Sequence, residues 1–229
     1  MQVEGYPAFL KTAPLGVVIF TGAARRHMGR ARRLDNESEA AGLDEIAFAE
    51  RAGDLIDSSL AAVLMAYLSV EACTNELMLA ARLGHAANMK GFDQTAARRL
   101  SDSFDAGAGQ LNPIEKADLI GIIAGNGPFD RGKGPGQPIR LLHSLRNALV
   151  HHKPEWIERS GAGTQSGDAL EKSLCTLFPT AAIWKSRNVP FRWNGCMGAG
   201  CADWAFSTAK HFNRMVYTSA GAPIPQILS

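Results

Sequence analysis

The sequence predicts an all-α protein, and three observations lead to that fold class. Apolar residues between positions 58 and 83 recur at steps of three and four, the period of an amphipathic helix. No segment shows a convincing ladder of alternating apolar and polar residues, as a half-buried strand would. Glycine and proline gather in loops, such as residues 126–138, that separate the helical stretches. At 229 residues we expect one helical domain of six or seven helices.

The first 57 residues are predicted to form an arm that packs on the rest of the chain. Residues 1–22 hold three glycines and two prolines and are expected to be extended or irregular. Residues 23–33 (AARRHMGRARR) read as a basic helix. Residues 35–57 read as an acidic amphipathic helix, interrupted or bent near Gly53. The positive charge of the first helix and the negative charge of the second predict that the two helices neutralise each other. The alternative is that the basic helix binds a polyanion.

Residues 58–83 give the strongest helical pattern and are expected to form a central buried helix. Residues 60–68 are apolar almost all round, which is typical of a helix with neighbours on several sides. Steps of three and four place seven residues on one stripe: Leu60, Leu64, Tyr67, Glu71, Asn75, Met78 and Arg82. Glu71 and Asn75 interrupt that stripe and need polar partners if they are buried.

The middle of the chain predicts three further elements. Residues 95–104 form a short helix, and a second helix begins at Asn112-Pro113-Ile114-Glu115 and runs to about residue 124. Asn is a preferred N-cap, Pro suits the first helical turn, and Glu three residues after the cap completes a capping box. After the loop 126–138, residues 138–152 form a helix that Pro154 stops, because the residue before proline disfavours helical backbone.

The last part of the chain predicts two helices and much irregular backbone. Residues 160–167 form a loop, 168–177 a helix, 178–200 an irregular segment, and 201–219 an amphipathic helix; residues 220–229 are expected to be a tail. Cys196 and Cys201 lack the second close Cys or His pair that a zinc site requires, so a disulfide or two ordinary thiols is expected there. GPFDRGKG at residues 127–134 lacks the Ser or Thr of a phosphate-binding P-loop.

The helix at residues 138–152 carries the most informative side chains. Its leucines cover one arc and are expected to face the core, while His143, Arg146, Asn147 and His151 fall on the opposite arc. Arginine binds phosphate bidentately and histidine transfers protons near neutral pH. Arg146 and His151 would therefore flank a groove. In the competing interpretation Arg146 pairs with Glu71, and Asn147 bonds to backbone or to Asn75, which pins two helices in register.

A family resemblance bears on this choice. LRNALVHHKPEW (residues 145–156) resembles the R-N-x-x-x-H signature of HEPN domains, and AYLSVEACTNEL (66–77) resembles their glutamate-bearing core helix. CADWAFSTAKHF (201–212) resembles a C-terminal helix of uncharacterised bacterial HEPN-like proteins. The resemblance implies a helical bundle over residues 58–219 that forms a homodimer. Many HEPN proteins are metal-independent endoribonucleases that act with an antitoxin or a defence partner protein.

The resemblance also implies roles for individual residues. Arg146, Asn147 and His151 would be the catalytic trio for attack of an RNA 2′-hydroxyl on the adjacent phosphate, with His151 as general acid or base. Glu71 would support the site. Apart from the resemblance, we expect Asn75 and His152 to support it, and Arg131, Lys133 and Lys153 to contact RNA. The alternative is a non-catalytic HEPN-like interaction or RNA-binding module in which the signature residues are structural.

Composition sets the remaining expectations. The net charge of +2 does not by itself predict nucleic-acid binding. Residues 13–24 are too short and too poorly flanked for a signal peptide, and no apolar run is expected to span a bilayer. We therefore expect a cytoplasmic protein with no membrane contact, no cofactor and no metal.

Overall fold

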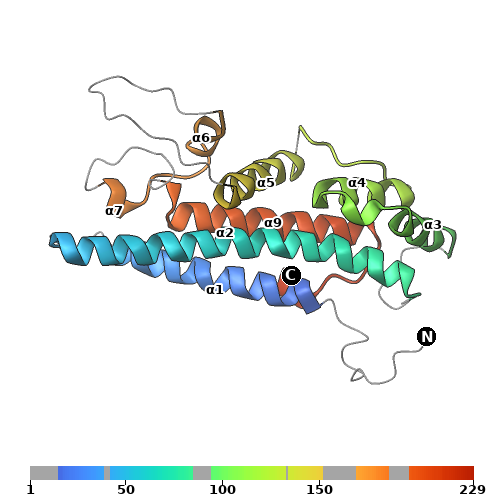
Figure 1. Cartoon of the computed structure of the whole chain (residues 1–229), viewed down its shortest axis with the longest axis horizontal. Helices are drawn as coiled ribbons and strands as arrows, with labels where there is room; N and C mark the ends of the chain where they lie inside the picture. The colour runs from blue at the N-terminus through green and yellow to red at the C-terminus, as the bar shows by residue number, and fades with distance from the viewer. Residues whose placement is uncertain (1–14, 39–41, 85–93, 133, 152–168, 186–195) are drawn as a thin grey trace. The chain divides into compact units, whose positions relative to one another are not determined.

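The computed structural model describes residues 15–38, 42–84, 94–132, 134–151, 169–185 and 196–229 (Figure 1). These residues form eight α-helices and two short 3₁₀ helices, and none of them lies in a strand. The prediction of an all-α fold is confirmed, with one or two more helices than expected. The predictions for residues 1–14 and for the loop 160–167 lie outside the described residues.

Two compact units make up the chain. The first comprises Met1–Ala23, Met65–Ile139 and Thr208–Ser229, and the second comprises Ala24–Leu64 and Arg140–Ser207. The divisions fall within four helices: α1 (Leu15–Ser38), α2 (Glu45–Arg82), α5 (Gly136–Val150) and α9 (Ala199–Ser219). Residues 57 and 58, the expected boundary between the arm and the HEPN-like domain, are consecutive residues of α2.

In the first unit, the beginning of α1 and the second halves of α2 and α9 are joined by buried polar contacts. Gly16 N–H donates to Glu76 Oε1 at 2.6 Å, and Asn213 Nδ2 donates to Ser69 Oγ at 3.1 Å. The surrounding core includes Tyr67, Val70, Met78 and Phe212, all nearly or fully buried. Residues 15–22 were predicted to be irregular, and that prediction is wrong: they form the first turns of α1.

The expected stripe on α2 is also displaced. Tyr67 and Met78 are buried, but Glu71 is half-buried and Asn75 and Arg82 are exposed. The buried arc instead runs through neighbouring positions, which include Val63, Ala66, Val70, Cys73, Thr74, Leu77 and Ala81. Because the helix is apolar almost all round near residues 60–68, the sequence pattern could not identify the arc that packs most deeply.

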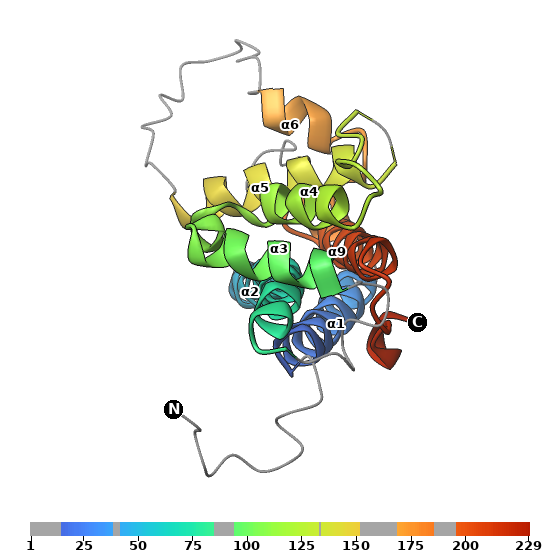
Figure 2. The same cartoon turned by 90° about the vertical axis from the view of Figure 1, so that its right-hand side faces the viewer.

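The same unit holds α3 (Gln94–Asp105), η3 (Ala108–Gln110) and α4 (Pro113–Ile123), which Figure 2 shows beside each other. The predicted capping box at α4 is confirmed. Asn112 Oδ1 accepts N–H bonds from Ile114 and Glu115 at 3.0 Å each, and Glu115 Oε2 accepts the Asn112 N–H at 3.0 Å. Arg82 of α2 pairs with Asp105 at 3.0 Å and lies over the Phe104 ring.

Residues 220–229, expected to be a tail, include the short helix η4 (Gln226–Leu228). The Leu228 side chain is fully buried, and Lys210 Nζ donates to the Ser229 carbonyl oxygen at 2.7 Å.

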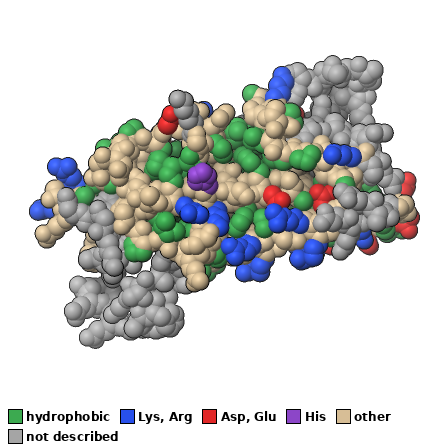
Figure 3. Space-filling model, turned by 180° about the vertical axis from the view of Figure 1, so that it is seen from behind, with side chains coloured by type: hydrophobic (Ala, Val, Ile, Leu, Met, Phe, Trp, Pro, Cys, Tyr) green, Lys and Arg blue, Asp and Glu red, His purple; other side chains and the backbone are tan. Residues whose placement is uncertain are grey.

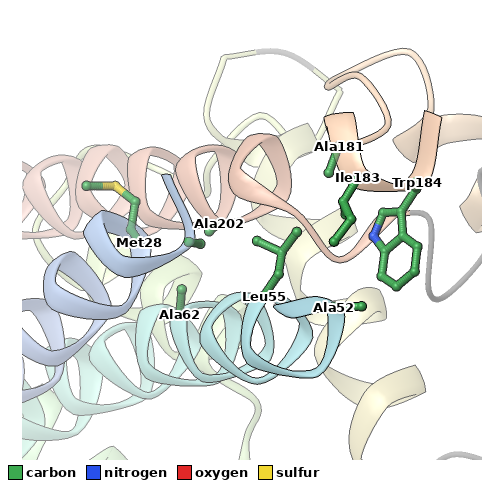
Figure 4. Close-up of a cluster of buried hydrophobic side chains, with 9 residues drawn as sticks. Met28, Ala52, Leu55, Ala62, Ala181, Ile183, Trp184 and Ala202 are labelled. Carbon is green, nitrogen blue, oxygen red and sulfur yellow. The ribbon is translucent and has the colours of Figure 1, made fainter. Parts of the chain in front are cut away.

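The second unit is built around an apolar cluster supplied by α1, α2, α9 and the short helix α7 (Ala182–Lys185). Its buried members are Met28, Ala31, Ala52, Leu55, Ala62, Ala181, Ile183, Trp184 and Ala202 (Figure 4). Trp184 meets Phe48 edge to face at 6.0 Å and donates its ring N–H to the Met197 carbonyl at 3.3 Å. Trp204 packs against Phe178 with ring centroids 5.7 Å apart.

Three boundary predictions in this unit need correction. α2 runs without interruption through Gly53, because Ala52 and Leu55 on either side are held in the apolar cluster and outweigh the conformational cost of one glycine. Residues 182–185 are helical rather than irregular, because the core takes up Ile183 and Trp184. α6 spans only Ala169–Leu174, shorter than the predicted 168–177.

Among the described residues, α2 is the helix that is long and apolar enough to cross a membrane by length and composition, contrary to the expectation that none would be. Its best window has a mean hydropathy of 1.5, and half of that window is buried within the structure. A core helix of a soluble protein has the same composition, so this property alone does not indicate a membrane span.

Candidate active site on helix α5

Helix α5 presents two different faces, as the sequence predicted. Ile139, Leu142 and Leu145 are completely buried and recur at steps of three. His143, Arg146 and Asn147 are half-buried. Leu141, Ala148 and Leu149, which were expected to face the core, are only half-buried because they flank the central apolar line. His143, Arg146 and Asn147 therefore lie at the border between the buried and exposed sides of the helix.

Asn147 links the side chains of Arg146 and His143. Arg146 Nη1 donates to Asn147 Oδ1 at 3.1 Å, and Asn147 Nδ2 lies 3.0 Å from His143 Nε2. Because Oδ1 receives the guanidinium N–H, the amide presents its NH₂ group to His143. His143 Nε2 must then accept, which requires the neutral tautomer with its proton on Nδ1.

His151 has a different setting. Its backbone N–H donates to the Asn147 carbonyl at 2.9 Å, which extends the helical hydrogen bonds by one residue past Val150. Its side chain is exposed. His143, which the sequence placed on the polar arc without a role, is thus the histidine in the Asn147 network, while His151 keeps an accessible ring. His152 and Lys153, expected to support the site and to contact RNA, lie outside the described residues.

Glu71 and Asn75 belong to the first unit, where Lys116 of α4 contacts Asn75. Lys116 Nζ donates to Asn75 Oδ1 at 2.8 Å. Burial lowers the pKa of Lys116, and the charge of Glu71 acts in the opposite direction. Nothing in the sequence pattern pointed to Lys116: it is the one cation in α4, and such a residue is ordinarily exposed on a helix surface.

Arg131 is held by a buried carboxylate in the first unit. Its Nε donates to Asp118 Oδ2 at 3.1 Å and its Nη2 donates to the same oxygen, while the Phe129 N–H donates to Asp118 Oδ1 at 2.9 Å. This pairing raises the pKa of Arg131. The guanidinium, predicted to contact RNA, also fastens the loop that precedes α5. Lys133, its predicted companion, lies outside the described residues.

The four cysteines are free thiols. Cys196 and Cys201 are both buried, and a hydrogen bond from one thiol to the other, together with burial, raises the pKa of Cys201 well above its ordinary value. A thiol held in its protonated form is a poor metal ligand. In the described part of the chain no three His, Cys, Asp or Glu side chains are grouped as a metal ion would require.

Comparisons of the chain with family models, curated proteins and solved structures found no match. Function is therefore inferred from the side chains of α5 and from the sequence signature that contains them.

Proposed function

We propose that the protein is a HEPN-like endoribonuclease that cleaves RNA by attack of a 2′-hydroxyl on the neighbouring phosphate. The observation that carries the proposal is the Asn147 bridge on α5, with Arg146 on one side and an exposed His151 one turn further on. A guanidinium held by a fixed hydrogen bond is suited to stabilising charge on phosphate oxygens, because little reorganisation is needed when the charge develops.

The two histidines take different roles in this proposal. His143 accepts from Asn147 and serves to orient the amide, which in turn orients Arg146. His151 is exposed, so its ring can reach a substrate hydroxyl or leaving group and act as general base or acid. Each chain supplies one such set of residues, and the family resemblance places two sets together in a homodimer.

The test is cleavage of a fluorescent single-stranded RNA in EDTA. Arg146→Ala and His151→Gln are expected to lower the cleavage rate by about a hundredfold or more, within the usual contribution of a proton-transfer group or a charge-stabilising donor. His143→Gln is the matched control: glutamine keeps an acceptor facing Asn147 but cannot transfer a proton, so activity within about tenfold of wild type is expected.

A reversed pattern, in which His143→Gln is inactive and His151→Gln is active, would move the proton transfer to His143. Cleavage that survives unchanged in Arg146→Ala would disprove the site.

A second candidate function is a non-catalytic RNA-binding or interaction module. It is favoured by the half-buried positions of Arg146 and Asn147 and by their bond to each other within one helix, which also suits a structural role. In that case Arg146→Ala lowers the thermal midpoint, and wild type leaves RNA intact across substrates of diverse sequence.

A further inference from the structure

A group of arginines surrounds one glycine on α1 and is not part of the α5 site. Residues three and four apart are adjacent on a helix surface. Around Gly29 these positions hold Arg25, Arg26, Arg32 and Arg33, and Arg30 follows Gly29 directly; the five are here called the arginine ring. Arg25 also lies over the Phe206 ring, 5.8 Å from its centroid. All five side chains are exposed and lie within about 160° of the helix circumference at 100° per residue.

Neighbouring helices neutralise the ring only in part. In the second unit, Arg30 pairs with Asp54 of α2 at 3.0 Å, and Arg32 Nε pairs with Asp203 of α9 at 2.7 Å. Both pairs remain half-exposed, so they are weak and screened by salt. The predicted neutralisation of the basic helix by acidic neighbours is therefore real but incomplete.

Arg26 and Arg33 are not in the ion pairs found among the described side chains, which here exclude residues 36–41. They are seven residues apart, two turns along the same side of α1, or about 10.5 Å along the axis. Two guanidiniums at that separation are placed to contact two separate phosphates of one strand.

Gly29 is not required by packing. A Cβ built there would meet only the Arg33 guanidinium, at 3.8 Å, and no residue of another described helix. A glycine in the middle of a helix is unfavourable relative to alanine by about 1 kcal/mol. Because glycine lacks a Cβ, a phosphate approaching between these arginines would meet only backbone at this position.

The ring fits a phosphodiester chain better than a lipid surface. A helix that lies on a membrane needs large apolar side chains beside its cations. Between residues 24 and 33 the apolar residues, Ala24, Met28 and Ala31, are buried in the core. Figure 3, a view from behind, shows Lys and Arg side chains on this face together with hydrophobic side chains between them.

We infer that the arginine ring of α1 binds the phosphate backbone of single-stranded RNA, with Arg26 and Arg33 as its main contacts. The choice of RNA as the polyanion rests on the proposed function. Because phosphates carry no base identity, this surface adds affinity and orientation without sequence specificity.

The test is fluorescence anisotropy with a labelled 2′-O-methyl single-stranded RNA, which binds but cannot be cleaved by 2′-hydroxyl attack. Binding is measured against salt for wild type, Arg26→Ala/Arg33→Ala and Arg98→Ala/Arg99→Ala. The last variant removes the same charge from exposed positions of α3. For single strands each phosphate contact contributes about 0.7 to the slope of log K against log salt, so the first variant should flatten the slope by about 1.4. The α3 variant should keep the wild-type slope.

Several results would overturn the inference: no salt-dependent binding by wild type, a wild-type slope in Arg26→Ala/Arg33→Ala, or equal flattening in the α3 variant. If wild type binds phosphatidylserine vesicles and Arg26→Ala/Arg33→Ala does not, while both bind RNA equally, the arginine ring binds membranes instead. The proposed function is tested independently of the arginine ring. If wild type does not cleave ordinary RNA but the salt slope of Arg26→Ala/Arg33→Ala is flatter, the ring binds RNA and the nuclease proposal is wrong. If wild type cleaves RNA and the two salt slopes are equal, the nuclease proposal is supported and the inference about the ring is wrong.

Discussion

Glu76 Oε1 accepts the backbone N–H of Gly16 at 2.6 Å, so a carboxylate from the last two turns of α2 caps the beginning of α1. Val17 N–H adds a second bond at 3.3 Å. The first N–H groups of a helix lack partners within it and favour negative charge, which makes this contact a tertiary N-cap. A Cβ at Gly16 would lie 2.8 Å from Glu76 Oε1 and 3.1 Å from Ala72 Cβ, so the close approach depends on glycine.

Glu76→Ala should destabilise the protein by about 1–3 kcal/mol, because it leaves two partly buried N–H donors without an acceptor. Urea unfolding followed by circular dichroism measures the change. Glu50→Ala is the control, since Glu50 is an exposed acidic residue of the same helix. An equal effect in both variants would show that the N-cap contributes nothing specific.

The pH dependence of Glu76 has a definite sign. Burial raises its pKa, partly opposed by the N–H bonds from Gly16 and Val17. The folded state therefore holds the carboxyl proton of Glu76 more tightly than the unfolded state does. The stability that this difference contributes is fully present below the pKa of Glu76 in the unfolded chain, and it is lost as pH rises through the pKa in the folded protein. The facing groups Cys73 and Tyr217 have raised pKa values and stay neutral in this window. Glu76→Gln should therefore flatten the fall in urea midpoint as the pH rises above about 4, the ordinary value for a glutamate carboxyl. A profile identical to wild type would contradict this assignment.

Leu55→Ala should be among the most damaging single substitutions in the second unit. Leu55 is completely buried and Figure 4 shows it beside Ile183 and Trp184 in the apolar cluster. Removing a buried leucine typically costs about 2–5 kcal/mol through lost burial and the cavity left behind. Thermal unfolding compares it with Ile46→Ala, whose side chain is 74% exposed and should matter little.

The sequence was most informative where local chemistry decides the structure. The capping box at Asn112, the helix at Gly136–Val150 and the helix at Ala199–Ser219 all depend on residues close together in the chain, and all were placed within a few positions. On α5 the same reasoning placed Leu142 and Leu145 correctly in the core, but Leu141, Ala148 and Leu149 are only half-buried, like Arg146 and Asn147.

Long-range contacts explain what the sequence could not supply. Gly16 was read as a sign of irregular backbone, but its lack of a side chain admits Glu76, sixty residues away. Lys116 could be recognised as a partner of Asn75 only once α2 and α4 were packed together. The choice of His143 rather than His151 as the partner of Asn147 depends on side-chain rotamers, and both histidines are four residues from Asn147.

Asn112→Ala should cost about 1 kcal/mol, because it removes the side-chain acceptor for the N–H groups of Ile114 and Glu115. Asn112→Asp retains an acceptor at the N-cap and should keep most of the stability. Chemical unfolding of the two variants at the same pH distinguishes the cap from any general effect of substitution at this position. Equal losses in both would mean that the asparagine contributes through something other than capping.

Two glycines in helices should respond oppositely to alanine. Gly53 lies in the interior of α2, and a Cβ built there meets nothing within 4 Å. Gly53→Ala should stabilise the protein by about 0.5–1 kcal/mol, because alanine restricts the unfolded chain and favours helix. A Cβ at Gly121 of α4 would lie 2.5 Å from the Gly127 carbonyl oxygen, a backbone atom of the loop before α5. Gly121→Ala should therefore destabilise by about 1–3 kcal/mol as the loop is forced away. Thermal midpoints measured side by side test both signs, and a gain at Gly121 would mean that the loop does not pack against α4 as described.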